Sequence, residues 1–213
     1  MDSSGSNTSQ LLELNAWAGD QAALAELFSC FRPRLRRIVD ARLDNRLKGR
    51  VDPSDVLQEA FIELARKLPK VRRKLDDDHA TMSMFVWMRM VTAERVLVTH
   101  RQHLEAGGRD VRRETPQHRT AASSIYLAEH LLAVFGSAEN RLMRQEMFST
   151  LQQTLESMES VDHEIITMRC FEELTNREAA EALGISQTGA SSRFVRAMTR
   201  LKKQLEEIPG FQA

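Results

Sequence analysis

The chain has 213 residues, of which 42% are apolar and 28% are charged. This composition is typical of a folded globular protein and excludes a fibre or a fully disordered chain. Thirty basic and thirty acidic side chains cancel, so only the distribution of charge can indicate a polyanionic partner. No stretch approaches the ~20 apolar residues that span a bilayer, and the first ten residues lack the features of an export signal. We therefore expect a cytoplasmic protein in which Cys30 and Cys170 are buried thiols.

Apolar residues recur at helical spacing along almost the whole chain, so we expect an all-α protein. Residues 1–9 are small and polar, and we expect them to be disordered. A first helix follows Asp20, and Pro33 is expected to kink or divide it. The segment 32–50 carries eight basic and two acidic residues. This excess makes it a locally basic region in a chain whose total charge is zero.

The next helix opens with a clear start signal. Asp52 suits the N-cap, Pro53 suits the first helical position, and Asp55 lies in the first turn, near the positive end of the helix dipole. Apolar residues from Val56 to Leu68 form its buried stripe, and the opposite face is acidic. We expect the strongly charged run 70–78 that follows to be a loop.

A third helix is expected over 83–104. Its valine-rich part, 91–98, would also suit a strand, but no partner strand is evident, so a helix is favoured. The polar residues 105–123 contain Gly107 and Gly108 and predict a linker. A short apolar helix over 125–135 is expected before the helices of the last third.

The segment 175–201, TNREAAEALGISQTGASSRFVRAMTRL, has the pattern of a helix-turn-helix. Thr175 or Asn176 can cap a short first helix, Gly184 permits the turn, and Ser186 can cap the second helix. Between 187 and 203 there are five basic residues and no acidic one. A basic, small-polar outer face suits the major groove of DNA. The alternative is a helical hairpin with a purely structural role.

Two distant segments resemble one family. The segment VDPSDVLQEAFIEL (51–64) resembles region 2.2 of sigma factors, which binds core RNA polymerase, and 175–201 resembles their region 4. Two such blocks in this order, in a chain of this length, are similar to the small extracytoplasmic-function (ECF) sigma factors. The runs SDVLQE and LTNREAA are most similar to a planctomycete-type subgroup.

The resemblance implies two small helical domains, like sigma region 2 (10–105) and sigma region 4 (140–208), joined by a linker (106–139). It implies a sigma factor that binds the β′ clamp helices and the β flap of core RNA polymerase and recognises the −10 and −35 promoter elements. An anti-sigma factor is a further partner that the family allows. The resemblance implies no enzymatic activity and no cofactor.

Three groups of residues carry these roles by resemblance. Core-polymerase binding is assigned to Asp55, Gln58 and Glu59, for which a solvated helix face is the alternative. Binding of the −10 strand is assigned to aromatic and basic residues, of which Trp87 also falls on an apolar stripe: Phe85, Trp87, Arg89, Arg95 and Arg101. Binding of the −35 element is assigned to Thr188, Ser191, Ser192, Arg193, Arg196, Thr199, Arg200 and Lys203.

One residue departs from the family pattern in the −10 region. Glu94 faces no cation that the sequence identifies, and it would repel phosphate. His100 and His103 are spaced as metal ligands can be, but no second His or Cys pair accompanies them, so we expect no metal site.

Two other functions stay open. One is a helix-turn-helix regulator that does not join the polymerase, and the other is a helical adaptor that does not bind DNA. The face formed by Asp55, Gln58 and Glu59 discriminates between them and a sigma factor, because only a sigma factor uses it.

Overall fold

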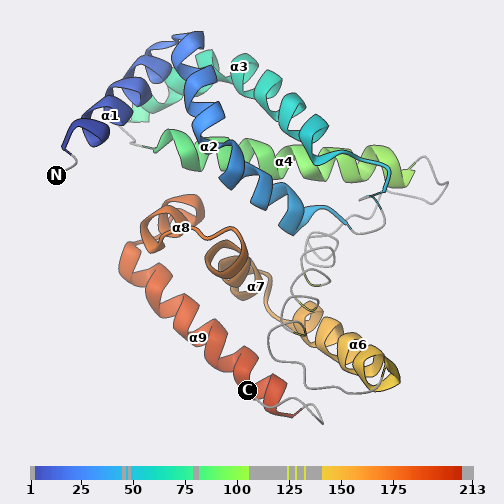
Figure 1. The fold of residues 1–213 in the computed structure, drawn as a ribbon. Coiled ribbons are helices and arrows are strands. Elements are labelled where there is room, and N and C mark those ends of the chain that lie inside the picture. The colour runs from blue at the N-terminus through green and yellow to red at the C-terminus, as the bar shows by residue number, and fades with distance from the viewer. Residues whose placement is uncertain are drawn as a thin grey trace.

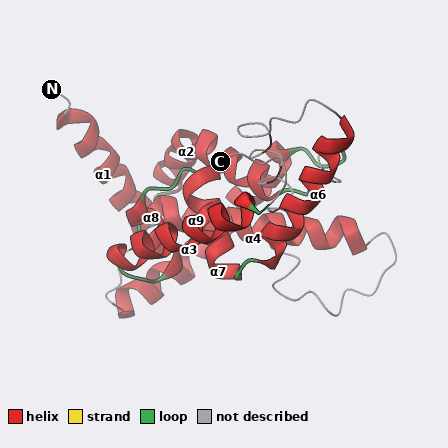
Figure 2. Cartoon of the chain, turned by 90° about the horizontal axis from the view of Figure 1, so that it is seen from below, coloured by secondary structure: helices red, strands yellow, loops and turns green. Residues whose placement is uncertain are grey.

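The computed structural model describes residues 3–44, 47, 49–78, 82–105, 124, 128, 132 and 141–207. Every regular element within these residues is a helix, as Figure 2 shows, and this confirms the all-α expectation. Among the described helices, none combines the length and the apolar character that a bilayer crossing requires.

The first four helices pack into one group, called the N-terminal bundle below (Figure 1). They are α1 (Ser3–Ala18), α2 (Gln21–Arg42), α3 (Pro53–Asp78) and α4 (Met84–Glu105). Their core consists of fully buried aliphatic side chains, among them Leu24, Leu35, Leu57, Leu64 and Met88. Two aromatic pairs extend this core, Trp17–Trp87 and Phe28–Phe61, with ring centroids 5.2 and 5.0 Å apart.

The structure differs from the expected disorder at residues 1–9, because α1 begins at Ser3. The second half of this helix packs Leu12, Ala16 and Trp17 against the core. A packed helical segment lowers the cost of extending the helix, because the unfavourable nucleation step is already complete. The small polar residues at the start therefore continue a helix that the later apolar residues hold in place.

Two prolines lie inside helices, and the sequence analysis expects one of them, Pro33, to kink or divide its helix. Pro33 lies within α2, which runs unbroken to Arg42, and Pro69 lies within α3. Both side chains are exposed, so the carbonyl groups that lose their amide partners can bond to water. The expected loop at 70–78 was wrong, because α3 continues to Asp78 through lysine and arginine residues of high helix propensity.

Other expectations for this half are confirmed. Asp52 accepts a hydrogen bond from the amide of Ser54 at 2.7 Å, and the helix begins at Pro53. The valine-rich segment 91–98 is helical throughout. Most of the expected short helix over 125–135 lies outside the described residues. Of this part of the chain, Ser124, Ala128 and Leu132 are described, and each is helical and buried.

The remaining elements form a second group, the C-terminal bundle. It contains α6 (Arg141–Ser157), α7 (Ser160–Ile166), the π-helical turn η1 (Thr167–Phe171), α8 (Asn176–Leu183) and α9 (Gln187–Glu206). Its core joins α6, α7 and α9 through Leu151, Leu155, Ile165 and Leu201. Figure 1 shows α8 lying next to the N-terminal bundle and α9 along the far side.

Helices α8 and α9 form the predicted helix-turn-helix. Thr175 and Glu178 make a reciprocal capping box at the start of α8, and the Ser186 hydroxyl accepts from the Gly189 amide at 3.0 Å at the start of α9. Between the helices Gly184 adopts the left-handed conformation, with φ 65°. The turn is therefore fixed by the residues that the sequence analysis singles out.

The two cysteines are exposed, which corrects the expectation of buried thiols. Cys30 lies on α2 beside Phe31 but off the stripe that faces the core, and Cys170 lies in η1. An apolar neighbour in sequence does not bury a residue whose helical angle points to solvent.

We predict that Gly184→Ala destabilises the chain by about 1–2 kcal/mol, because a Cβ is strained in the left-handed conformation. Apart from Gly184 and its two chain neighbours, nothing lies within 4 Å of the added Cβ, so this backbone strain is the sole expected cost. Gly184→Asn is the matched control and should cost less, because asparagine tolerates this conformation. Urea unfolding of both variants measures the difference, and equal losses would contradict the backbone explanation.

A second prediction concerns His163 of α7, which is 2% exposed and lies 3.0 Å from the Ser124 hydroxyl. The pKa of His163 is lowered to about 4, chiefly by burial; the attraction of Glu164 opposes this shift and the repulsion of Arg42 adds to it. The folded chain thus binds fewer protons here than the unfolded chain, whose histidine titrates near 6.5. This contribution to stability is complete above pH 6.5 and is lost as the pH falls towards 4.

The free energy of unfolding should therefore decrease by up to about 1.4 kcal/mol per pH unit within this range. His163→Gln should remove that slope, and His103→Gln on the exposed face of α4 is the control. Urea unfolding measured between pH 6 and pH 5, above the range where carboxylates titrate, checks the result. Parallel slopes for the wild type and His163→Gln would show that His163 does not titrate on unfolding.

Candidate functional site

The acidic face of α3 is open to solvent. Asp55, Gln58 and Glu59 are all exposed. Ile62 lies three residues after Glu59 on the same face and is 66% exposed, although it is a large apolar residue. Polar groups around an exposed apolar side chain are typical of a protein-binding surface. The sequence analysis missed Ile62. Its position three residues after Glu59 and four after Gln58 could have placed it on the acidic face.

Two of the predicted site residues bind each other in this structure. The Arg95 Nε donates to the Glu59 carboxylate at 2.8 Å, so a residue assigned to polymerase binding pairs with one assigned to the −10 strand. Glu94 also has a cationic partner, because the Lys67 ammonium lies 2.6 Å from its carboxylate. The expectation that Glu94 faces no cation was wrong, since α3 and α4 pack side by side and bring distant residues together.

The five residues assigned to the −10 strand do not form one open surface. Phe85, Trp87 and Arg89 are buried, Arg95 is half-buried and Arg101 is exposed. Trp87 packs on Trp17, in agreement with the core alternative for this residue. The Phe85 ring has the Arg34 guanidinium 3.6 Å from its centroid.

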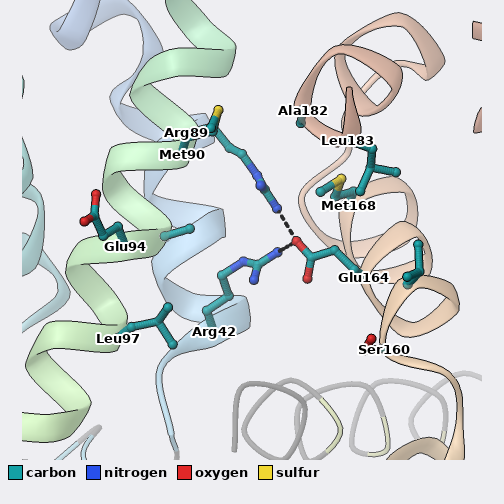
Figure 3. A pocket seen from close by; sticks show the side chains of 12 residues that line it. Arg42, Arg89, Met90, Glu94, Leu97, Ser160, Glu164, Met168, Ala182 and Leu183 are labelled. Atoms are coloured by element: carbon teal, nitrogen blue, oxygen red, sulfur yellow. Dashed lines mark hydrogen bonds and ion pairs between the residues drawn. The ribbon is translucent and has the colours of Figure 1, made fainter. Parts of the chain in front are cut away.

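Arg89 is buried because the C-terminal bundle covers it. Arg42 of α2 and Arg89 of α4 meet Glu164 of α7 (Figure 3), and both also bind Glu172, which follows η1. Arg42 lies 2.6 Å from Glu164 and 2.5 Å from Glu172, and Arg89 lies 2.8 Å from each. Glu172 is 0% exposed. These four side chains, called the buried ionic cluster below, join the two bundles. Three of them, Arg42, Arg89 and Glu164, also line a cleft of about 410 Å³.

Two members of the buried ionic cluster, Glu164 and Arg42, hold their charge strongly. Burial alone would raise the pKa of Glu164, but Arg42 and Arg89 hold that pKa far below its usual range. Burial would likewise lower the pKa of Arg42, and the attraction and hydrogen bonds of Glu164 and Glu172 raise it instead. Two guanidinium groups and two carboxylates therefore share one site with balanced charge.

Further ion pairs connect the same two bundles. Arg34 binds Glu178 through two parallel hydrogen bonds of 3.0 and 2.9 Å, and Arg37 lies 3.2 Å from Glu173. The amide of Ser83 donates to the Glu181 carboxylate. In each ion pair the N-terminal bundle supplies the cation and the C-terminal bundle supplies the carboxylate.

The outer face of α9 is exposed and polar, as the sequence analysis predicts. Its described exposed residues are Thr188, Ser191, Ser192, Arg196, Thr199, Arg200 and Lys203, and Arg193 is half-buried. The opposite face packs Ala190, Ala197 and Leu201 into the C-terminal core. Arg200 differs from the other cations because it pairs with the buried carboxylate of Asp162.

Val195 was missed by the sequence analysis as a site residue. It lies within the outer face of α9 and is 59% exposed. An apolar side chain among serine, threonine and arginine on such a face suits contact with the methyl group of thymine.

No group of three or more metal-ligating side chains gathers among the residues that the structure describes. His100 is buried, and its Nε2 accepts a hydrogen bond of 3.0 Å from the Asp44 amide, which gives it a structural role. His103 is exposed on α4.

Comparisons with known proteins agree with this arrangement. The family model described as ECF sigma factor matches residues 5–207. The chain is 26% identical to RNA polymerase sigma-H factor of Pseudomonas aeruginosa over 158 residues, covering 74% of this chain and 75% of that protein. It is 25% identical to ECF RNA polymerase sigma factor SigD of Mycobacterium tuberculosis over 190 residues, covering 89% and 80% of the two chains.

A solved structure has a similar fold. It is that of CnrH in complex with the cytosolic domain of CnrY, with a TM-score of 0.50 and 16% identity, and the match covers 93% of this chain and 97% of that one. The family match spans both the acidic face of α3 and the helix-turn-helix. The chain therefore belongs to the ECF sigma factor family, and it is a sigma factor that binds core RNA polymerase and directs transcription from promoter DNA.

Proposed function

We propose a division of labour within this sigma factor in which α3 docks core RNA polymerase, α9 reads the −35 element and α4 receives the −10 strand. The observation that carries this proposal is the outer face of α9, which is exposed, basic and free of acidic residues next to a capped helix-turn-helix. In the proposal the region 2 domain spans 10–105, the linker 106–139 and the region 4 domain 140–208.

The chain supplies binding and no chemistry of its own in this proposal. The free energy of binding unpaired −10 bases drives strand opening, and the polymerase carries out RNA synthesis in the cytoplasm. The solved neighbour CnrH is in complex with the cytosolic domain of a second protein, CnrY. We extend the proposal to a protein partner of the anti-sigma type for this chain.

Within α9, the proposed roles follow from side-chain chemistry. Arg196 can donate two hydrogen bonds to a guanine edge, and Thr188, Ser191, Ser192 and Thr199 are short enough to let the helix approach the bases. Arg193, Arg200 and Lys203 are assigned to phosphates. The Arg200 contact requires its guanidinium to exchange Asp162 for a phosphate, so its contribution should be smaller than that of Lys203.

We predict that replacing Asp55 and Gln58 together with alanine weakens binding to core polymerase about tenfold, which corresponds to about 1.4 kcal/mol. Ile62→Ser should weaken it by a similar factor, because a polar rim acts with an apolar centre. Titration of labelled core polymerase measures both affinities. Glu156→Gln on the exposed face of α6 is the control and should bind as the wild type does. Unchanged affinity for both α3 variants would reject α3 as the docking face.

We also predict that Arg196→Ala lowers initiation by the reconstituted holoenzyme and relaxes base preference at one −35 position, at a cost of about 1–3 kcal/mol. Lys203→Ala should weaken all promoters alike and reduce the salt dependence of binding. Lys202→Ala, which removes the same charge from a residue paired with Glu206, is the control. Promoter selection from a randomised library provides the measurement. A base preference that is the same for Arg196→Ala and the wild type would contradict the assignment.

A further inference from the structure

The basic region of α2 has no role in the proposed function, which uses α3, α4 and α9. Arg34, Arg37 and Arg42 follow one another at helical spacing and point towards the C-terminal bundle, together with Arg89 of α4. We call these four side chains the arginine surface. The N-terminal bundle thus presents a row of cations on the side where α4 carries Phe85 and Arg89.

Each member of the arginine surface is matched by a carboxylate of the C-terminal bundle. Arg42 and Arg89 bind Glu164 and Glu172, and the remaining two pairs are Arg34 with Glu178 and Arg37 with Glu173. The exposure of these pairs rises from the fully buried Glu172 to the mostly exposed Glu173. One negatively charged face therefore covers one positively charged face.

The geometry of these contacts is also the geometry of phosphate recognition. Arg34 donates two parallel N–H···O hydrogen bonds to the Glu178 carboxylate, and arginine binds a phosphate group with the same bidentate geometry. The Phe85 ring lies beneath this guanidinium. The Phe31 ring packs on the Phe85 ring, with the two ring centroids 5.1 Å apart. Cationic groups beside aromatic rings are the combination that tracks the backbone and bases of single-stranded DNA.

We propose that the arginine surface is a phosphate-binding site for the promoter strand that α4 receives, and that the carboxylates of Glu164, Glu172, Glu173 and Glu178 occupy it in the free chain. DNA and the C-terminal bundle are then alternative ligands of the same four arginines. This inference rests on the proposed role of α4. It adds α2 to the DNA-binding surface and makes the packed arrangement of the bundles a state that excludes the −10 strand.

The first experiment separates the bundles by removing negative charge. In the full chain, Glu164→Gln combined with Glu172→Gln leaves Arg42 and Arg89 without counter-charges in the packed state, which disfavours that state. The chain has two cysteines, Cys30 and Cys170, which are both exposed and lie one in each bundle, so a dye pair on these thiols reports separation by energy transfer. The probe for binding is a fluorescent oligo(dT) strand of about 20 nucleotides.

We expect lower energy transfer and an apparent affinity for oligo(dT) that rises about tenfold, because the packed state reduces affinity by the fraction of chains that are open. Glu178→Gln, a milder change at a half-buried pair, should move both readings in the same direction. Glu206→Gln on the exposed side of α9 is the control for charge and should change neither. Unchanged energy transfer in both interface variants would overturn the claim that these carboxylates hold the bundles together.

The second experiment tests the arginines themselves in the separated background. Arg34→Gln and Arg37→Gln should each lower the affinity for oligo(dT) and reduce the slope of log affinity against log salt by about 0.7, the value for one phosphate contact on a single strand. Arg32→Gln is the matched control, because it removes the same charge from the other side of α2, where the side chain is exposed. If Arg34→Gln and Arg37→Gln behave as Arg32→Gln does, the arginine surface is not a DNA-binding site.

Initiation by the same variants with core polymerase distinguishes a failure of the arginine-surface inference from a failure of the proposed function. Promoter-dependent initiation with no effect of Arg34 or Arg37 would overturn this inference and leave the proposed function intact. Loss of initiation by the wild-type chain itself would reject the proposed function.

Discussion

Two carboxylates, the half-buried Glu164 and the fully buried Glu172, control how the halves of this sigma factor meet. Glu172 is fully buried, and a buried carboxylate is tolerated only where cations and hydrogen bonds replace the water it has lost. Arg42 and Arg89 supply both, from two different helices of the N-terminal bundle. Since neither carboxylate nor guanidinium can stay buried alone, the packed arrangement requires all four groups at once. The geometry of the bundles is therefore specified by charge pairing as well as by apolar contact.

The apolar part of the interface is continuous with the N-terminal core. Met168, Leu174 and Ala179 of the C-terminal bundle belong to the same buried cluster as the residues of α2 and α4. Buried ion pairs contribute little net stability, because the cost of desolvation offsets much of their attraction. An interface that combines a small apolar area with such pairs can separate when a competing anion rehydrates or replaces the carboxylates. This balance suits a protein whose two DNA-binding bundles must act at different promoter elements.

Much of the fold could be predicted from the sequence, because it depends on local rules. The caps at Asp52 and Ser186 and the turn at Gly184 are set by neighbouring residues, and the structure has them as predicted. Of the two cap candidates for α8, Thr175 is the cap. The errors arose where distant packing decides the outcome. Helix α1, which the sequence analysis did not expect at residues 3–9, packs on the bundle through Trp17 and Trp87. Glu94 pairs with Lys67 only because α3 lies against α4.

The candidate site shows the same limit. The exposed face of α9 follows from helical spacing within one segment, and prediction succeeded there. The burial of Arg89 could not be predicted, because it results from a second bundle more than 70 residues along the chain. Phe85 packs instead on Phe31 and Arg34 of α2, and this contact also depends on distant packing. The excess of arginine in 32–50 was visible in the sequence, but the carboxylates that it faces come from residues that carry no shared motif.

The packed arrangement affects the proposed surfaces unequally. The α3 face with Asp55, Gln58 and Ile62 is exposed in the packed chain, and so is the outer face of α9. The side of α4 that carries Arg89 is covered, together with the arginine surface of α2. Polymerase can therefore dock before the bundles separate, whereas the −10 strand can enter only afterwards. In this order of events a free chain does not hold melted DNA, and separation of the bundles accompanies assembly with the polymerase, where the melted strand is produced.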